Sequence, residues 1–366
     1  MTPSAPRTLP VMTTDPRARI LTGDTPTGRL HLGHWVGSLE RRVALQDQYD
    51  CYFLLANMHA FTTRFDKPQD IRADTIEIVK DWLAAGIDPA RSTIVLQTEV
   101  PAIAELTWFL AMLLSFNDVM GNPTLVHELE TKGLKDSYSF GFPMYTVGQC
   151  ADILAFRPTF VPVGEDQAPH IEMCRKAARK FNQLYCNVPN RTEDDDYPAR
   201  GGVFPIPKAL IGRVGRLPGI DGKQKMSKSL GNAIFLSDPE KDVQKKLNRV
   251  QNPTRNEQGV PDLATGALFT FVDAFVTDPA HNADLRDRYQ RGVIMDGHVK
   301  QEVAAAVQKL LAPMRERRAA LDGPAGDDRA LAIIKDGVRR ANATAEETLY
   351  LAKKAMSLDF GRRTLA

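Results

Sequence analysis

Two short polar segments, far apart in the chain, carry residue types suited to phosphate chemistry. In the first, His31 and His34 flank Leu-Gly and follow the turn-rich segment 23–28 (G-D-T-P-T-G). Two histidines at the start of a helix can both face an anion and donate hydrogen bonds to oxygens that gain negative charge in a transition state. Gly33, between them, permits the close approach of an adenine or a ribose. Taken alone, the segment is equally compatible with surface histidines at an ordinary helix start.

The second segment is 225–229 (K-M-S-K-S), which lies in a loop flanked by Gly222 and Gly231. Lys225 and Lys228 in such a loop can swing onto a polyphosphate and neutralise a departing pyrophosphate. The alternative for an isolated K-x-x-K is a solvated lysine loop. The first segment is neither a G-x-G-x-x-G dinucleotide fingerprint nor a P-loop, because no Gly-Lys-Ser/Thr follows it.

Strands and helices are expected to alternate around the first segment. Short apolar runs predict buried strands at 19–22, 51–56, 93–96 and 160–163. Apolar spacing and cap residues predict helices from 31 to 45, from 66 to 86 and after Pro101. This alternation predicts an α/β fold with a doubly wound, parallel, Rossmann-like sheet. Ligands of such sheets bind beyond the carboxyl ends of the strands, where the histidines are expected.

The chain is expected to divide into three parts. Residues 1–18 are rich in Pro, Thr and Ser and lack periodicity, which predicts a disordered tail. Residues 19–237 hold both polar segments and form the expected Rossmann-like catalytic domain. Strand signals stop at about Asp238, so residues 238–366 are expected to form a smaller helical domain with polar breaks at 251–261 and 322–328. Its last helix is expected to pack back on the catalytic domain.

Composition excludes several classes of protein. The 366 residues carry 47 Lys and Arg against 45 Asp and Glu, a net charge of +2, which excludes a uniformly basic nucleic-acid coat. The longest strongly apolar stretch, 108–116, is shorter than the ~20 residues that cross a bilayer, and the N-terminus has no apolar signal core. The 4 cysteines form no C-x-x-C pair, which disfavours disulfides and zinc and predicts buried thiols. We therefore expect a cytoplasmic protein without a structural metal or a membrane partner.

The two polar segments together, H-L-G-H and K-M-S-K-S, resemble the paired signatures of class I aminoacyl-tRNA synthetases. Three blocks between and before them resemble tryptophanyl-tRNA synthetases of the bacterial type: 26–28 (P-T-G), 151–154 (A-D-I-L) and 161–172, which contains V-P-V-G-E-D-Q and H-I-E. The resemblance extends over residues 19 to 360. It implies ATP-dependent activation of L-tryptophan to tryptophanyl-adenylate, followed by transfer to tRNA(Trp).

The resemblance also implies roles for individual residues. Asp152 is expected to accept the indole N–H, which suits an acceptor-only carboxylate and a donor-only indole. The predicted catalytic residues are His31, His34, Lys225 and Lys228. The predicted ATP-binding residues are Thr25, Gly33, His34, Gly37, Asp166, Lys225, Met226, Ser227 and Lys228. The predicted tryptophan-binding residues are Leu21, His59, Gln149, Asp152, Ile153, Val161, Val163, Gly164 and Gln167. Mg²⁺ is expected to arrive bound to ATP, without a dedicated protein site.

The chain departs from the bacterial pattern at the amino-acid pocket. Gln149 stands where bacterial members usually have an apolar Met. With Tyr145 and Asp152 it forms Y-x-x-x-Q-x-x-D, which also resembles the tyrosyl-tRNA synthetase pocket, so tyrosine is the alternative substrate. Leu21 argues against tyrosine, because tyrosyl enzymes normally have a Tyr near the end of the first strand. Three further departures restore the general class I signature: Thr25, His31 and His34.

The family resemblance, more than composition, implies that residues 238–366 bind the tRNA anticodon. Several arginines could contact RNA phosphates from helices: Arg315, Arg317, Arg318, Arg339 and Arg340. The resemblance also implies a homodimer, with the helix around 108–116 contributing to the interface. Two other functions stay open, a synthetase-like paralogue with a regulatory or binding role and a nucleotidyltransferase of the H-x-G-H superfamily.

Overall fold

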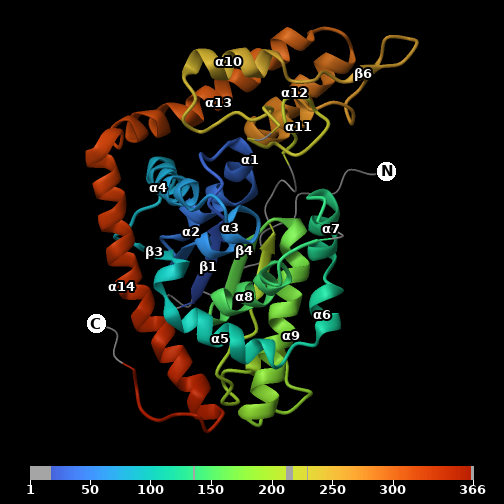
Figure 1. The fold of residues 1–366 in the computed structure, drawn as a ribbon. Coiled ribbons are helices and arrows are strands. Elements are labelled where there is room, and N and C mark those ends of the chain that lie inside the picture. Colours follow the sequence, from blue (N-terminus) through green and yellow to red (C-terminus); the bar gives the residue numbers. More distant parts are fainter. Residues whose placement is uncertain (1–17, 135–136, 212–216, 229, 364–366) are drawn as a thin grey trace.

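A five-stranded parallel sheet forms the centre of the molecule (Figure 1). The computed structural model describes residues 18–134, 137–211, 217–228 and 230–363. The strands are β1 (Arg19–Asp24), β2 (Asp50–Leu55), β3 (Ser92–Leu96), β4 (Phe160–Val163) and β5 (Lys208–Ile211), in the order β3-β2-β1-β4-β5. The predicted doubly wound α/β fold is therefore confirmed. The expected tail lies outside the described residues, except for Ala18.

The four predicted strands are all present, and β5 is a fifth that the sequence does not predict. Its four residues, K-A-L-I, are only half-buried at the edge of the sheet. Such a short edge strand carries neither the long apolar run of a central strand nor a clear alternation of apolar and polar residues.

Both faces of the sheet are buried, as a parallel sheet requires. On one face Ile20, Phe53 and Ile94 belong to a core that continues into the helices. On the other face Leu21 and Val161 belong to a second core. Successive residues of β1 thus point into different cores, because side chains alternate along a strand.

Helices cover both faces of the sheet. α1 (Leu32–His34), α2 (Glu40–Leu45) and α4 (Pro68–Ala85) pack on the first face, and α5 (Pro101–Ala111), α8 (Gly141–Ala155) and α9 (Ala168–Tyr185) pack on the second. Shorter elements connect them: α3 (Asn57–Arg64), η2 (Gln97–Glu99), α6 (Phe116–Met120), α7 (Pro123–Thr131), η3 (Glu165–Gln167) and η4 (Asp194–Asp196).

Two predicted helices differ from expectation. The helix after His31 is interrupted by a π-helical turn, η1 (Trp35–Leu39), before α2 begins. π-turns of this kind are rare and occur mostly at functional sites. The prediction of one helix around 108–116 is also wrong, since α5 ends at Ala111 and α6 begins only at Phe116. In the described part of the chain, no helix is long and apolar enough to cross a membrane.

The C-terminal part is mainly helical, and all of its helices but the last lie at one end of the sheet domain (Figure 1). It contains α10 (Glu240–Asn248), α11 (Leu268–Phe275), α12 (Pro279–Gln290), α13 (Asp296–Ala319) and α14 (Gly323–Ala355). Two expectations for this part need correction. A two-stranded ribbon, β6 (Thr254–Arg255) and β7 (Pro261–Asp262), pairs within the predicted break at 251–261. The break at 322–328 is almost absent, because Pro324 is tolerated in the first turn of α14.

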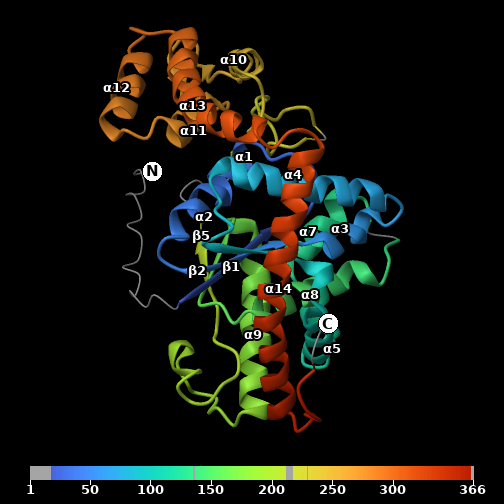
Figure 2. The same cartoon turned by 90° about the vertical axis from the view of Figure 1, so that its left-hand side faces the viewer.

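The long helix α14 returns along the sheet domain and runs beside β3 and α5 (Figures 1 and 2). Gly337 makes this contact possible, because a β-carbon built there would lie 1.9 Å from the carbonyl oxygen of Ile94. Further along α14, Ala341 and Ala345 are fully buried in the second core. Small residues therefore allow the backbone of α14 to approach the sheet closely.

Candidate functional site

The first signature lies beyond the carboxyl end of β1, beside the point where the order of strands reverses between β1 and β4. The chain leaves β1 through an exposed Thr25 and turns at Gly28, whose φ of +100° favours glycine. α1 then begins after His31. The fold thus places the histidines at the edge where ligands of doubly wound sheets bind.

The two histidines form one compact pair. The backbone N–H of His31 donates to Nδ1 of His34 at 3.1 Å, and the ring centroids are 3.8 Å apart. Burial, reinforced by positive charge nearby, lowers the pKa of His31 to about 2 and that of His34 to about 4. Both rings are therefore neutral at physiological pH. Because Nδ1 of His34 is an acceptor here, its Nε2–H is available to donate to a ligand.

An ion pair supports this end of β1. Arg42, from α2, donates to both carboxylate oxygens of Asp24 at 2.7 and 2.9 Å, and the indole N–H of Trp82 donates to one of them at 2.9 Å. These partners hold the pKa of Asp24 below its usual value, against the effect of its burial. No role for this pair is predicted from the sequence, although the position of Asp24 at the end of a buried strand is a signal that could identify it.

The second signature lies directly against the first. The segment that follows it pairs with residues 30–32: Leu32 N–H donates to the Ile234 carbonyl and Leu236 N–H to the Leu30 carbonyl, both at 2.9 Å. Met226 is buried behind Gly33, and a β-carbon built on Gly33 would lie 3.5 Å from that of Met226. Residues far apart in the sequence are thus joined by main-chain hydrogen bonds.

The side chains of the second signature point in different directions. Lys225 and Lys228 are exposed, whereas Met226 anchors the loop in the core. The Nζ of Lys228 would lie 2.5 Å from a β-carbon built on Gly28, so this lysine reaches the loop of the first signature. The backbone N–H of Ser227 donates to Asn232 at 2.8 Å. The last residue of the signature, Ser229, lies outside the described residues.

A second polar group lies at the carboxyl ends of β2 and β3. Asp152, on α8, is only 1% exposed. Gln97, directly after β3, donates from Nε2 to both oxygens of this carboxylate at 2.9 Å. His59, on α3, has Nε2 3.4 Å from Oδ2 of Asp152. This geometry makes Asp152 a buried acceptor held in place by two neighbouring side chains.

Burial shifts the pKa values of this group strongly. It raises the pKa of Asp152 to about 8, which the hydrogen bond from Gln97 partly opposes. It lowers the pKa of His59 to about 4, and nearby His170 adds to that effect. His59 is therefore a neutral partner rather than a cation. At neutral pH the carboxyl group of Asp152 is therefore largely protonated in the ligand-free protein, and its carbonyl oxygen can still accept a hydrogen bond from the N–H of a ligand.

Comparison with known proteins identifies the family of proteins to which these two sites belong. The family model described as "tRNA synthetases class I (W and Y)" matches residues 13–312. A tryptophan–tRNA ligase from Treponema pallidum (strain Nichols) is 39% identical over 93% of this chain and 97% of its own length. One from Chlamydia caviae is 40% identical over 83% of this chain and 86% of its own length.

The chain belongs to the bacterial tryptophanyl-tRNA synthetases. A crystal structure of tryptophanyl-tRNA synthetase from Campylobacter jejuni complexed with ADP and tryptophan is 27% identical to it, with a TM-score of 0.72 over 93% of this chain and 100% of that one. A tyrosyl-tRNA synthetase from Aeropyrum pernix, 20% identical with a TM-score of 0.65 over 87% of this chain and 90% of that one, shares the fold. Tyrosine is therefore not favoured as the substrate, since the relatives near 40% identity are tryptophan–tRNA ligases.

The residues predicted for the tryptophan pocket of this synthetase fall into two groups. Three are fully buried in the second core: Leu21, Ile153 and Val161. The others lie at or near the carboxyl edge of the sheet, where His59 contacts Asp152 and where Gln149, Val163, Gly164 and Gln167 are half-buried. The assignment of both groups to a tryptophan pocket stays a prediction.

The residues predicted for ATP are likewise spread over neighbouring loops. Gly37 lies in the π-turn, and a β-carbon built there would meet none of the described atoms within 4 Å. Asp166 follows β4, where its carboxylate turns back toward Gly164 and its carbonyl accepts from the Thr124 hydroxyl at 2.7 Å. These assignments remain predictions.

Gln97 and the partners of Tyr145 are not predicted from the sequence. The hydroxyl of Tyr145 lies 3.1 Å from Glu128 and 3.3 Å from Nε2 of His170, so α7, α8 and α9 meet beside the pocket. Burial raises the pKa of Tyr145. The position of Gln97 at the end of a buried strand is a usable signal, whereas nothing local to the sequence joins Glu128 to His170.

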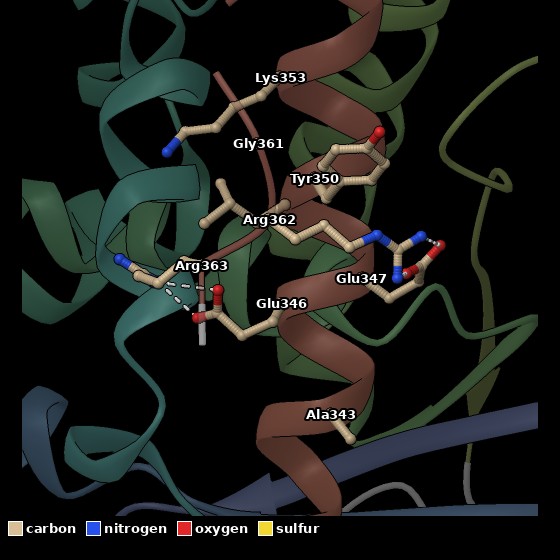
Figure 3. A pocket seen from close by; sticks show the side chains of 9 residues that line it. Ala343, Glu346, Glu347, Tyr350, Lys353, Gly361, Arg362 and Arg363 are labelled. Atoms are coloured by element: carbon tan, nitrogen blue, oxygen red, sulfur yellow. Dashed lines mark hydrogen bonds and ion pairs between the residues drawn. The ribbon is translucent and has the colours of Figure 1, made fainter. Parts of the chain in front are cut away.

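A surface pocket lies away from both signatures, where residues 361–363 fold back on the last turns of α14 (Figure 3). Arg362 covers the ring of Tyr350 and pairs with Glu347. Arg363 pairs with Glu346. The charged groups that line the pocket therefore pair with one another, and these pairs hold residues 361–363 against α14.

Three of the predicted RNA-binding arginines have partners within the protein. Arg318 is 9% exposed and pairs with three carboxylates. Arg317 donates to the Ala84 carbonyl at 2.6 Å, and Arg340 donates to the carbonyls of Pro89 and Ser92. Long guanidinium side chains near a second element bind its carbonyls and carboxylates, so sequence alone overestimates their availability.

Cysteines and metal ligands add no further site within the part of the chain that the structure describes. Cys51, Cys150 and Cys174 are buried free thiols, as predicted, whereas Cys186 is half-buried. Within the same residues, no group of three or more His, Cys, Asp or Glu side chains is arranged to hold a metal ion.

Proposed function

We propose that the chain activates L-tryptophan with ATP and transfers it to tRNA(Trp). One observation carries this proposal. The two signatures meet through the Leu30 and Leu32 hydrogen bonds at the same edge of the sheet where Asp152 offers a buried acceptor. An activated nucleotide and an indole-bearing amino acid then fit side by side across the carboxyl ends of β1 to β4.

In the first step, a carboxylate oxygen of tryptophan attacks the α-phosphorus of ATP. A new P–O bond forms, the bond to the β-phosphate bridge breaks, and pyrophosphate leaves with the electron pair. His31 and His34 donate hydrogen bonds to the phosphates as neutral rings, and Lys225 and Lys228 neutralise the β- and γ-phosphates. No protein nucleophile is needed, because positioning and charge stabilisation lower the barrier.

The same proposal assigns the rest of the pocket. Asp152 accepts the indole N–H while Gln167 positions the amino acid, and the half-buried Val163 and Gly164 border the ring. Gly33, Gly37 and Asp166 contact adenosine. Mg²⁺ would come with the ATP phosphates and offset their charge, since the described residues supply no cluster of their own.

In the second step, a terminal ribose hydroxyl of the tRNA attacks the adenylate carbonyl and AMP leaves. We assign anticodon binding to residues 238–366, where exposed Arg339 remains a candidate for RNA contact. A homodimer is also part of the proposal. Trp108, Met112 and Phe116 are 63%, 73% and 73% exposed, and large apolar side chains that gather on a surface favour an interface. We place the enzyme in the cytoplasm.

Amino-acid-dependent ATP–pyrophosphate exchange, run with each of the twenty amino acids, tests the proposal. We expect exchange with tryptophan alone. Exchange with tyrosine would keep the fold and mechanism but refute the assignment of Asp152. Silence with all twenty would favour a paralogue with a binding role, which a gel shift with total tRNA at low salt would then examine.

A further inference from the structure

Leu30, the residue before the first signature, has both of its backbone polar groups held by hydrogen bonds. The backbone N–H of Leu30 donates to Oδ2 of Asp81, on α4, at 2.7 Å. The carbonyl of Leu30 accepts from Leu236, in the segment after the second signature, at 2.9 Å. His31 is the next residue. The carboxylate of Asp81 therefore fixes the point at which the two signatures meet.

Asp81 is itself joined to the C-terminal part of the chain. Its Oδ1 lies 3.2 Å from Nε of Arg318, in the last turn of α13. Asp81 is 1% exposed and Arg318 is 9% exposed. Arg318 also pairs with Glu77 at 2.5 Å and with Asp322 at 2.8 Å. Of these three carboxylates, Asp81 is the one that contacts the signature segment.

The chemistry of Asp81 suits an acceptor that must stay in place. Burial raises the pKa of its carboxyl group to about 6, and the Leu30 N–H and Arg318 oppose that rise. The group is therefore ionised at neutral pH, with one oxygen committed to each partner. A buried ion pair is weak evidence for stability. Its two directed hydrogen bonds are better evidence for a fixed geometry.

We propose that Asp81 is a positioning residue for the ATP site. It acts through its hydrogen bond with the backbone N–H of Leu30, and Arg318 orients the Asp81 carboxylate from α13. This inference rests on the proposed ATP site at the two signatures. It gives the end of α13 a direct route to His31, through Arg318, Asp81 and Leu30. A displacement of the C-terminal helices would then change the position of the histidines.

The test compares Asp81→Ala with Glu77→Ala in the full-length chain. Both variants take a carboxylate from Arg318, but only the first leaves the buried Leu30 N–H unpaired. We expect the Kd for ATP, measured by calorimetry, to rise about tenfold in Asp81→Ala and to change less than about twofold in Glu77→Ala. The Kd for tryptophan should stay near the wild-type value in both. Asp81→Asn keeps an acceptor oxygen and should restore most of the ATP affinity.

A double variant removes the pair without leaving a buried charge. Replacing both partners of a buried ion pair by apolar residues is often neutral for stability, so Asp81→Leu with Arg318→Met should fold even if Asp81→Ala does not. We expect it to bind ATP about tenfold more weakly and to melt only a few degrees below the wild type, because the buried Leu30 N–H is left unpaired. Wild-type ATP affinity in this double variant, or equal losses in Asp81→Ala and Glu77→Ala, would overturn the inference. Failure of wild-type exchange with tryptophan would refute the proposed function instead, because ATP affinity is measured separately.

Discussion

The side-chain amide of Gln97 lies 2.9 Å from each carboxylate oxygen of Asp152. Its own oxygen accepts from the backbone N–H groups of Met58 and His59 at 3.0 and 3.3 Å. One buried amide therefore joins the end of β3, the first turn of α3 and the last turn of α8. These contacts make Gln97 the residue that sets the position of Asp152 and of His59.

We expect Gln97→Ala to raise the KM for tryptophan about tenfold and to leave the KM for ATP nearly unchanged, because Asp152 loses a directed partner inside the pocket. Pyrophosphate exchange at varied tryptophan and ATP measures both constants. Asn57→Ala is the matched control. Asn57 also joins α3 to the turn after β3, through hydrogen bonds with Thr98, without contacting Asp152. Equal effects of the two substitutions would show that Gln97 acts only by stabilising α3.

Asp152 should make the ligand-free protein less stable as the pH rises. Its pKa is about 8 in the folded protein against an ordinary value of 3.8, so the folded state holds a proton that the unfolded state has lost. The contribution of the raised pKa to the free energy of unfolding is complete below about pH 4 and is lost as the pH rises through 8. Thermal melting at several pH values should show the melting temperature of Asp152→Asn rising relative to that of the wild type between pH 4 and 8. A difference that does not change with pH would contradict the raised pKa.

Lys225→Ala should lower the rate of tryptophan-dependent pyrophosphate exchange about a hundredfold, because the charge that faces the departing pyrophosphate is lost. The Kd for tryptophan should change little. Lys223→Ala, an exposed lysine of the same loop outside the signature, is the control. If both variants exchange at the wild-type rate, the assignment of this loop to phosphate binding is wrong.

Charge placed on the apolar surface at the end of α5, where Trp108 lies in the helix and Met112 directly follows it, should break the proposed homodimer. Trp108→Glu combined with Met112→Glu buries two carboxylates in any interface formed there, which costs several kcal/mol. Analytical ultracentrifugation should show a dimer for the wild type and a monomer for this variant. Val293→Glu changes an exposed apolar residue of the C-terminal part and should leave the dimer intact. A wild-type chain that sediments as a monomer would refute the proposal itself.

The sequence alone determined the local features of this protein. Apolar runs gave four of the five strands, because residues buried on both faces of a parallel sheet must be apolar. The two signatures and the block around Asp152 gave the family, since their residue types are tied to phosphate and indole chemistry. The strand β5 and the ribbon of β6 and β7 escaped prediction because two to four residues at an edge carry no distinctive pattern.

Only the tertiary structure decided which distant groups meet. Main-chain pairing of Leu30 with Leu236 joins the two signatures, and no local pattern encodes it. Arg318 appears in the sequence as a candidate RNA contact but is buried against Asp81, because its partner lies on a helix more than two hundred positions earlier. The place of Gln97 at the end of a buried strand marks it as a candidate, but its partner Asp152 is brought to it only by the packing of α8. Such partners depend on how helices pack against the sheet, so their roles became visible only in three dimensions.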